Sequence, residues 1–248
     1  MIVYSNSCSP GSPGQGHKIY PEIIAESLGA EVVNSGMAGA TNRRIIRTSI
    51  RDLTELKQQH QDIVAVLGLT FIARAELWQP WLPAIENDGH FRPIMVDHSK
   101  VDWSIKGLID TIVPDIANLA DRRVKDYYQQ WLLHYHAESA VTDLLTDIIM
   151  FSGWAHNNNI RHIIFSSPDA FTDDSKVGYN SPFIKSLREE VESNPFVVNP
   201  WTTSFNGYIL SKGFKFKESK TFRLHGHPDQ DGHQAWANFL IERLQTNQ

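Results

Sequence analysis

The chain has 248 residues, of which 41% are hydrophobic and 10% aromatic, enough to bury a full core in one large domain. A formal net charge of −5 gives no broad basic field, so we do not expect nucleic acid as a partner. The N-terminus has no basic segment followed by an apolar one, and no apolar run approaches about 18 residues, which predicts a soluble, cytoplasmic protein without a membrane segment. The one cysteine, Cys8, excludes an internal disulfide framework and a multi-thiolate zinc site.

Strand and helix patterns alternate at the start of the chain. Residues 1–5 form a short apolar run that ends in a turn-rich stretch, which indicates a strand. Residues 20–29 predict a helix closed by Gly29, and residues 30–36 predict a second strand. An amphipathic helix is expected over 42–61, followed by an almost wholly apolar strand at 62–69. Such runs are typical of parallel strands that helices cover on both faces.

The pattern is less regular in the middle of the chain and resumes afterwards. Residues 71–122 fit no βα repeat, so we interpret them as an insertion or lid. A long helix is expected at 123–157, a fourth buried strand at 161–167, a surface helix at 181–193 and a last helix at 233–244. Together these elements predict an α/β fold, in one domain over residues 1–248, with a central parallel sheet flanked by helices. Ligands bind such sheets beyond the carboxyl ends of the strands.

The ends of the first three predicted strands are rich in small and hydroxyl-bearing residues. They read SNSCS at 5–9, NSGMAGATN at 34–42 and GLT at 68–70, and they should meet at one edge of the sheet. A serine after a strand, glycine amides at the next strand end and a histidine from a late loop are the groups that acyl transfer needs. The late stretch HGHPDQDGH at 225–233 offers the histidine.

This arrangement resembles the SGNH (GDSL-like) hydrolases. The resemblance implies a flavodoxin-like three-layer α/β/α sandwich and hydrolysis of small esters, such as acetylated carbohydrates or short acyl esters. SNS matches the family's GDS block and implies Ser7 as nucleophile, while LHGHP matches the DxxHP block and implies His227 as general base. The family's glycine after the second strand matches Gly39 in NSGMAGATN, and its GxND block matches GLTF at 68–71. These matches imply Gly39 and Thr70 as donors to the oxyanion.

Several positions depart from the family pattern. Thr70 stands where the family has asparagine, and Leu224 stands where it has the aspartate that orients the histidine. Asp229 and Asp231 lie close by in sequence, and a carboxylate or a backbone carbonyl from elsewhere can take over that task. A catalytically degenerate relative that uses the same pocket to bind a ligand is therefore the second hypothesis.

Other interpretations of the same residues stay open. Ser7 can cap a turn, Gly36 and Gly39 can supply positive φ, and Cys8 can be a small buried thiol. In a third hypothesis the histidines and aspartates of 225–233 hold a metal ion for hydrolysis, although His233 repeats with the apolar face of the last helix and should pack inward. The stretch GSPGQGHK at 11–18 lacks the Lys-Ser/Thr order of a phosphate-binding loop. We expect no cofactor and a small-molecule ester substrate, and the sequence leaves the oligomeric state open.

Overall fold

The computed structural model describes residues 1–248 except 15, 73, 79–90, 95–129, 131–135, 169–180, 217–226 and 247–248. Within this part of the chain no helix is long and apolar enough to cross a membrane.

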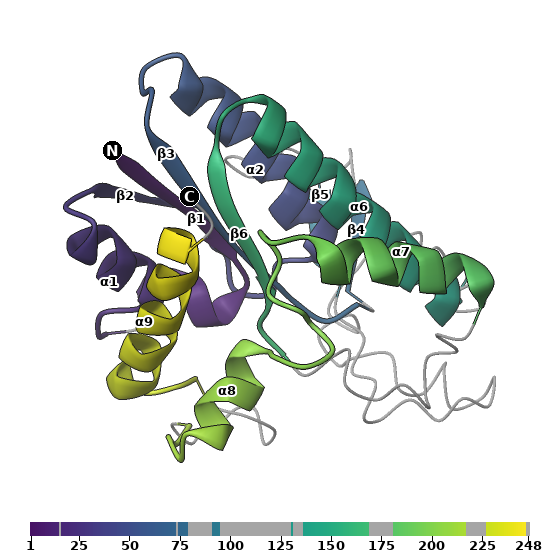
Figure 1. Ribbon diagram of the computed structural model, residues 1–248. Helices are drawn as coiled ribbons and strands as arrows, with labels where there is room; N and C mark the ends of the chain where they lie inside the picture. Colours follow the sequence, from purple (N-terminus) through teal and green to yellow (C-terminus); the bar gives the residue numbers. More distant parts are fainter. Residues whose placement is uncertain are drawn as a thin grey trace, which may run out of the picture.

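A parallel sheet of four strands forms the centre of the fold (Figure 1). Its strands are β1 (Ile2–Ser7), β2 (Glu31–Asn34), β3 (Ile63–Leu69) and β6 (Arg161–Ser166), in the order β2-β1-β3-β6. The register places Ile2 between Glu31 and Ile63. Residues 197–204 lie beside β6, since isolated parallel bridges join Ile164 to Val197 and Ser166 to Ser204. All four predicted strands are present, and their parallel pairing is confirmed.

Helices cover both faces of this sheet and make a three-layer α/β/α sandwich (Figure 1). One layer holds α2 (Asn42–Lys57), α6 (Ala137–Asn157) and α7 (Pro182–Ser193), and the other holds α1 (Tyr20–Ser27), α8 (Phe205–Ser211) and α9 (Gln230–Thr246). Successive strand residues point to opposite faces, so Val64 and Val66 join the α1–α9 core while Ala65 and Leu67 join the α2–α6 core. The predicted fold class is thus confirmed.

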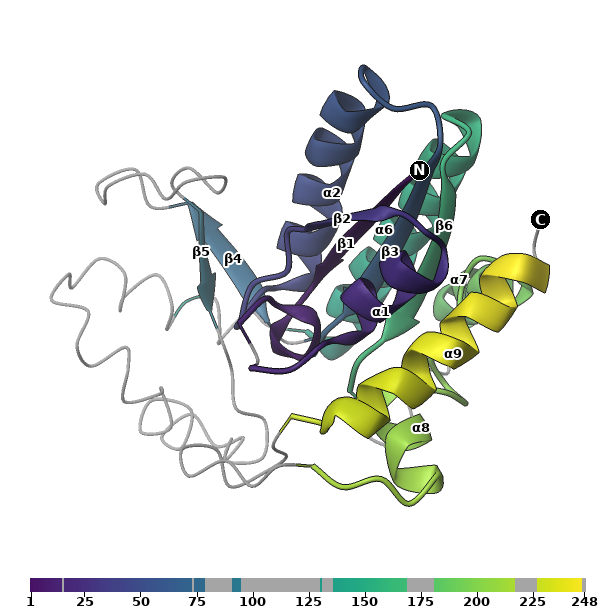
Figure 2. The ribbon, with the colours of Figure 1, turned by 90° about the vertical axis from the view of Figure 1, so that its left-hand side faces the viewer.

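Four elements differ from the sequence-based prediction: α6, β4 (Ala75–Trp78), β5 (Phe91–Ile94) and α8. The long helix starts at Ala137, because His136 has an extended backbone (φ −123°, ψ 117°); residues 123–129 and 131–135 lie outside the described part. Within the region predicted to be irregular, β4 pairs antiparallel with β5, and Figure 2 shows this hairpin beside α2. Helix α8 was not predicted.

Buried polar groups fix β1 against α2. Asn6 Nδ2 donates to Thr48 Oγ1 at 2.8 Å, and the Tyr4 hydroxyl donates to the Asp52 carboxylate at 2.9 Å. Burial, with the nearby Asp52 charge, raises the pKa of Tyr4 well above its usual range, so the phenol stays a donor. Asn6 therefore holds the strand to a helix.

Candidate active site

Ser7, Gly39 and Thr70 lie in or after strand ends on the carboxyl side of the sheet, and their grouping with His227 as one site stays a prediction. Ser7 ends β1, Gly39 lies between β2 and α2, and Thr70 directly follows β3. His227 reaches this edge because α9 begins beside the start of α1, where His233 Nδ1 accepts a hydrogen bond from the Tyr20 amide at 3.3 Å. The predicted site thus combines residues from four separate parts of the chain.

Ser7 lies beneath the turn that follows β1. Its side chain is 0% exposed, and its Oγ donates to the Cys8 carbonyl at 3.1 Å rather than to His227. A Cβ atom on Gly11 would overlap Ser7 Oγ, and one on Gly68 would come within 3.0 Å of Ser7 Cβ. A substrate can reach Ser7 only after the turn has moved, and the nucleophilic role of Ser7 stays a prediction.

Ser9 is a partly exposed serine just after β1. It begins the short 3-10 turn η1 (Ser9–Gly11) and is half-exposed, while Cys8 before it is buried. Its Oγ lies 3.8 Å from Cys8 Sγ, and its carbonyl accepts hydrogen bonds from the amide and the hydroxyl of Ser12. The sequence analysis did not single out Ser9. Ser9 follows β1 in the same SNSCS stretch, so the sequence offered it as a third serine beside Ser5 and Ser7.

Gly39 has a left-handed backbone (φ +80°) in the loop that leads into α2. The turn is closed by the Ala40 amide, which donates to the Met37 carbonyl at 3.0 Å. Thr41 then caps α2, since its Oγ1 accepts from the Arg44 amide at 3.0 Å. Gly36 has no positive φ; a Cβ there would lie 2.9 Å from the Gly11 carbonyl oxygen, so close packing is what requires glycine.

Thr70 is held by a side chain that the sequence analysis missed. Asn42 Oδ1 accepts from the Thr70 amide at 2.6 Å, and Asn42 Nδ2 donates to the Thr70 carbonyl at 3.1 Å. Asn42 thereby pairs with Thr70 as a neighbouring strand would. Thr70 Oγ1 is buried and has no hydrogen-bond partner among the described residues. A buried hydroxyl without a partner is costly, so this one is a candidate donor. Thr70 is 0% exposed, as Ser7 is, so its hydroxyl meets a ligand only after the covering segment has moved.

His227 is half-buried at the same edge. Burial, and secondly the charge of nearby His17, lower its pKa, so the imidazole is neutral at pH 7. Its Nδ1 is buried and has no hydrogen-bond partner in the described ranges. Asp229 Oδ1 instead accepts from the Gly232 amide at the start of α9, and Asp231 is exposed. Leu224 and His225 lie outside the described residues.

Aromatic rings pack around His233 at the start of α9. His233 is fully buried, which confirms that it packs inward; its ring lies 5.4 Å from that of His17 and is stacked on Tyr20 at 6.0 Å. Burial raises the pKa of Tyr20 far above its usual range. Among the described residues, no three His, Cys, Asp or Glu side chains are grouped to hold a metal ion.

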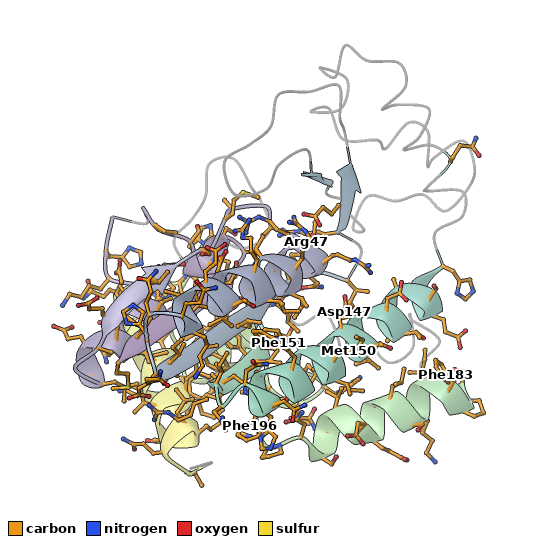
Figure 3. All side chains as sticks on the ribbon, turned by 90° about the horizontal axis from the view of Figure 1, so that it is seen from above. Arg47, Asp147, Met150, Phe151, Phe183 and Phe196 are labelled. Atoms are coloured by element: carbon orange, nitrogen blue, oxygen red, sulfur yellow. The ribbon has the colours of Figure 1, made fainter. Side chains whose placement is uncertain are left out.

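A hydrogen-bonded serine–histidine pair lies at the opposite edge of the sheet. Ser152 Oγ on α6 is 2.8 Å from His162 Nε2 near the start of β6, and Asn194 Nδ2 donates to Ser152 Oγ at 2.9 Å. The His162 ring packs between Phe151 and Phe196, both labelled in Figure 3. Because Ser152 is 4% and His162 2% exposed, substrate has no access, and we interpret this pair as a structural tie between α6 and the sheet.

A sequence model of a family of unknown function, DUF6071, matches residues 10–242. The chain belongs to this family. No curated protein matches the sequence of this DUF6071 member.

Solved structures of esterases and lipases are similar to this DUF6071 chain. A G-D-S-L family protein from Desulfitobacterium hafniense is 14% identical over 98% of both chains, with a TM-score of 0.45. A catalytic mutant of an acetylxylan esterase from Geobacillus stearothermophilus is 12% identical over 98% of this chain and 93% of its own (TM-score 0.44). A lipase/acylhydrolase from Enterococcus faecalis is 9% identical over 99% and 95% (TM-score 0.43). At these scores, neither fold nor activity follows from the similarity.

Proposed function

We propose that this DUF6071 protein hydrolyses small esters by a serine–histidine mechanism at the carboxyl edge of its sheet. The observation that carries the proposal is the half-exposed Ser9 on a tight turn directly after β1. The same edge holds His227, Gly39 and Thr70, which can serve as base and as oxyanion donors.

In the first half of the reaction, Ser9 Oγ attacks the ester carbonyl carbon while His227 accepts the serine proton. The carbonyl oxygen becomes an oxyanion, which the Gly39 amide and the Thr70 hydroxyl stabilise. The intermediate collapses when the carbon–oxygen bond to the alcohol breaks and His227 returns the proton to the alcohol. Water then attacks the acyl-serine in the same way, releasing the acid and restoring Ser9.

The electrostatics of the edge support these roles. A neutral His227 can accept a proton at pH 7, as a general base must. The Thr70 hydroxyl has no hydrogen-bond partner among the described residues, so its O–H can donate to an oxyanion. Asn42 already bonds the Thr70 amide and carbonyl. The described residues offer His227 no carboxylate, and loss of that acid costs about 10⁴-fold in kcat in a well-studied triad. We therefore expect a slow enzyme.

Ser7 is the alternative nucleophile within this mechanism. It requires the Ser9–Gly11 turn to open, because its Oγ is enclosed by Gly11 and Tyr20. The second function is a non-catalytic binding protein, which the buried Ser7 and the missing carboxylate favour. Ser9 as nucleophile, Ser7 as nucleophile and the binding protein predict different results for Ser9→Ala and Ser7→Ala, each of which removes one hydroxyl oxygen.

The test is labelling by a serine-reactive fluorophosphonate, mass mapping of the adduct, and hydrolysis of 4-nitrophenyl acetate. We expect the adduct on Ser9, and we expect Ser9→Ala to lose both labelling and hydrolysis at an unchanged melting temperature. Ser7→Ala is the matched control and should keep the label. An adduct on Ser7 would reverse the assignment, and absence of any adduct together with equal background rates would favour the binding protein. A chelator in the same assay tests the metal hypothesis.

A further inference from the structure

Arg74 is a cation at the candidate site that has no acidic partner among the described residues. Three other basic side chains have acidic partners: Lys18 pairs with Glu26, Arg51 with Asp52, and Arg47 with Glu76 through two hydrogen bonds of 2.7 and 3.3 Å. In Figure 3, Arg47 lies on the side of α2 that faces the β4–β5 hairpin. Its ion-pair partner Glu76 lies in β4. The guanidinium of Arg74 instead contacts a backbone carbonyl and an aromatic ring.

These two contacts place the Arg74 guanidinium against the residues that follow the two candidate oxyanion donors. Its Nη1 donates to the Ala40 carbonyl at 3.2 Å, and Ala40 directly follows Gly39. Its central carbon lies 5.1 Å from the centre of the Phe71 ring, and Phe71 directly follows Thr70. The charge is thus held where the ester group is expected to bind.

The segment that carries Arg74 is fixed and accessible. Asn42 holds the Thr70 backbone, and the Arg74 amide donates to the Phe71 carbonyl at 3.3 Å, which closes a turn. Arg74 is half-exposed, so a ligand can reach it. The N-terminus of α2, capped by Thr41, adds positive potential at the same place. A guanidinium with one N–H used keeps further donors in a planar fork that matches a carboxylate.

We propose that Arg74 binds a carboxylate carried by the substrate, so that the preferred esters are those in which the acyl or alcohol part bears an acid group. The preference among esters rests on the proposed hydrolase function. Binding of a carboxylate by Arg74 does not depend on that function. The net charge of −5 repels anions from the molecule as a whole, so a local cation decides whether an acidic ester binds.

The kinetic test compares mono-4-nitrophenyl succinate with the neutral 4-nitrophenyl acetate. In Arg74→Gln the ratio of their kcat/KM values, anionic over neutral, should fall roughly tenfold or more, the effect expected for a lost hydrogen bond to a charged group. Arg74→Lys keeps the charge and should give an intermediate ratio, which preserves the test if the Gln variant unfolds. Arg161→Gln makes the same charge change at the opposite edge, next to Asp62, and should leave the ratio unchanged.

A binding measurement separates this inference from the proposed function. Isothermal titration of N-(4-nitrophenyl)succinamic acid, an amide that the reaction should not cleave readily, should show affinity that Arg74→Gln weakens roughly tenfold. Binding of that acid through Arg74 without hydrolysis of either ester would defeat the hydrolase proposal and leave this inference standing. The inference is overturned if wild type and Arg74→Gln share the same ratio and affinity. It is also overturned if Arg74→Gln slows both esters equally, which would assign Arg74 to the oxyanion.

Discussion

Replacing Asn42 by alanine tests whether its side chain holds the Thr70 segment. Asn42 is 6% exposed and makes hydrogen bonds of 2.6 and 3.1 Å to the Thr70 amide and carbonyl. Without it the buried amide has lost its partner, which costs about 1–3 kcal/mol, and the second bond adds about 1 kcal/mol. We expect Asn42→Ala to lower the free energy of unfolding by roughly 2–4 kcal/mol. At about 2–4 °C per kcal/mol for a chain of this size, the melting temperature should fall by roughly 4–16 °C.

Urea denaturation followed by circular dichroism, together with thermal melting, measures this loss. The matched control is Asn238→Ala, because Asn238 is an exposed helical asparagine whose bond to Gln234 is open to solvent. It should change stability by less than about 0.5 kcal/mol. An Asn42→Ala protein within about 0.5 kcal/mol of wild type would refute the reasoning, because water or a neighbouring group would then satisfy the Thr70 amide.

Two further predictions concern the turn after β1 and the candidate base. Gly11→Ala should destabilise by roughly 1–3 kcal/mol in thermal melting, since its Cβ would overlap the Tyr20 hydroxyl; Gly153→Ala, on an open helix surface, should instead stabilise by about 0.5–1 kcal/mol. Equal melting temperatures for the two variants would contradict the packing. Because burial and His17 lower the pKa of His227, its basic form persists below the usual range, so kcat/KM for an ester should fall with decreasing pH at a midpoint below about 6.5. His17→Gln should move that midpoint upward, and a midpoint at or above 6.5 in wild type would count against His227 as the base.

The fold is confirmed, whereas the site remains a prediction. The resemblance implied Ser7, Gly39, Thr70 and His227, and the structure puts Ser7 at the end of β1, Thr70 directly after β3 and Gly39 before α2. Which hydroxyl faces substrate depends on how a turn of a few residues covers the strand end. The SNSCS stretch contains three serines. The sequence does not predict which of them is covered, and only the structure shows that Gly11 packs against Ser7.

The sequence by itself determined the layers of this protein, because periodicity is a local property. An apolar run such as 62–69 must be buried on both faces, and an amphipathic stripe such as that of α2 must pack against it. The interactions at the candidate site join residues far apart in the chain: hydrogen bonds of Asn42 with Thr70 and of Arg74 with Ala40, and the effect of the His17 charge on the pKa of His227. Such contacts depend on loop lengths and turn geometry, which leave no periodic signal. Only the tertiary structure decided them, since a side chain's burial, pKa and partners are set by the segments that packing brings beside it.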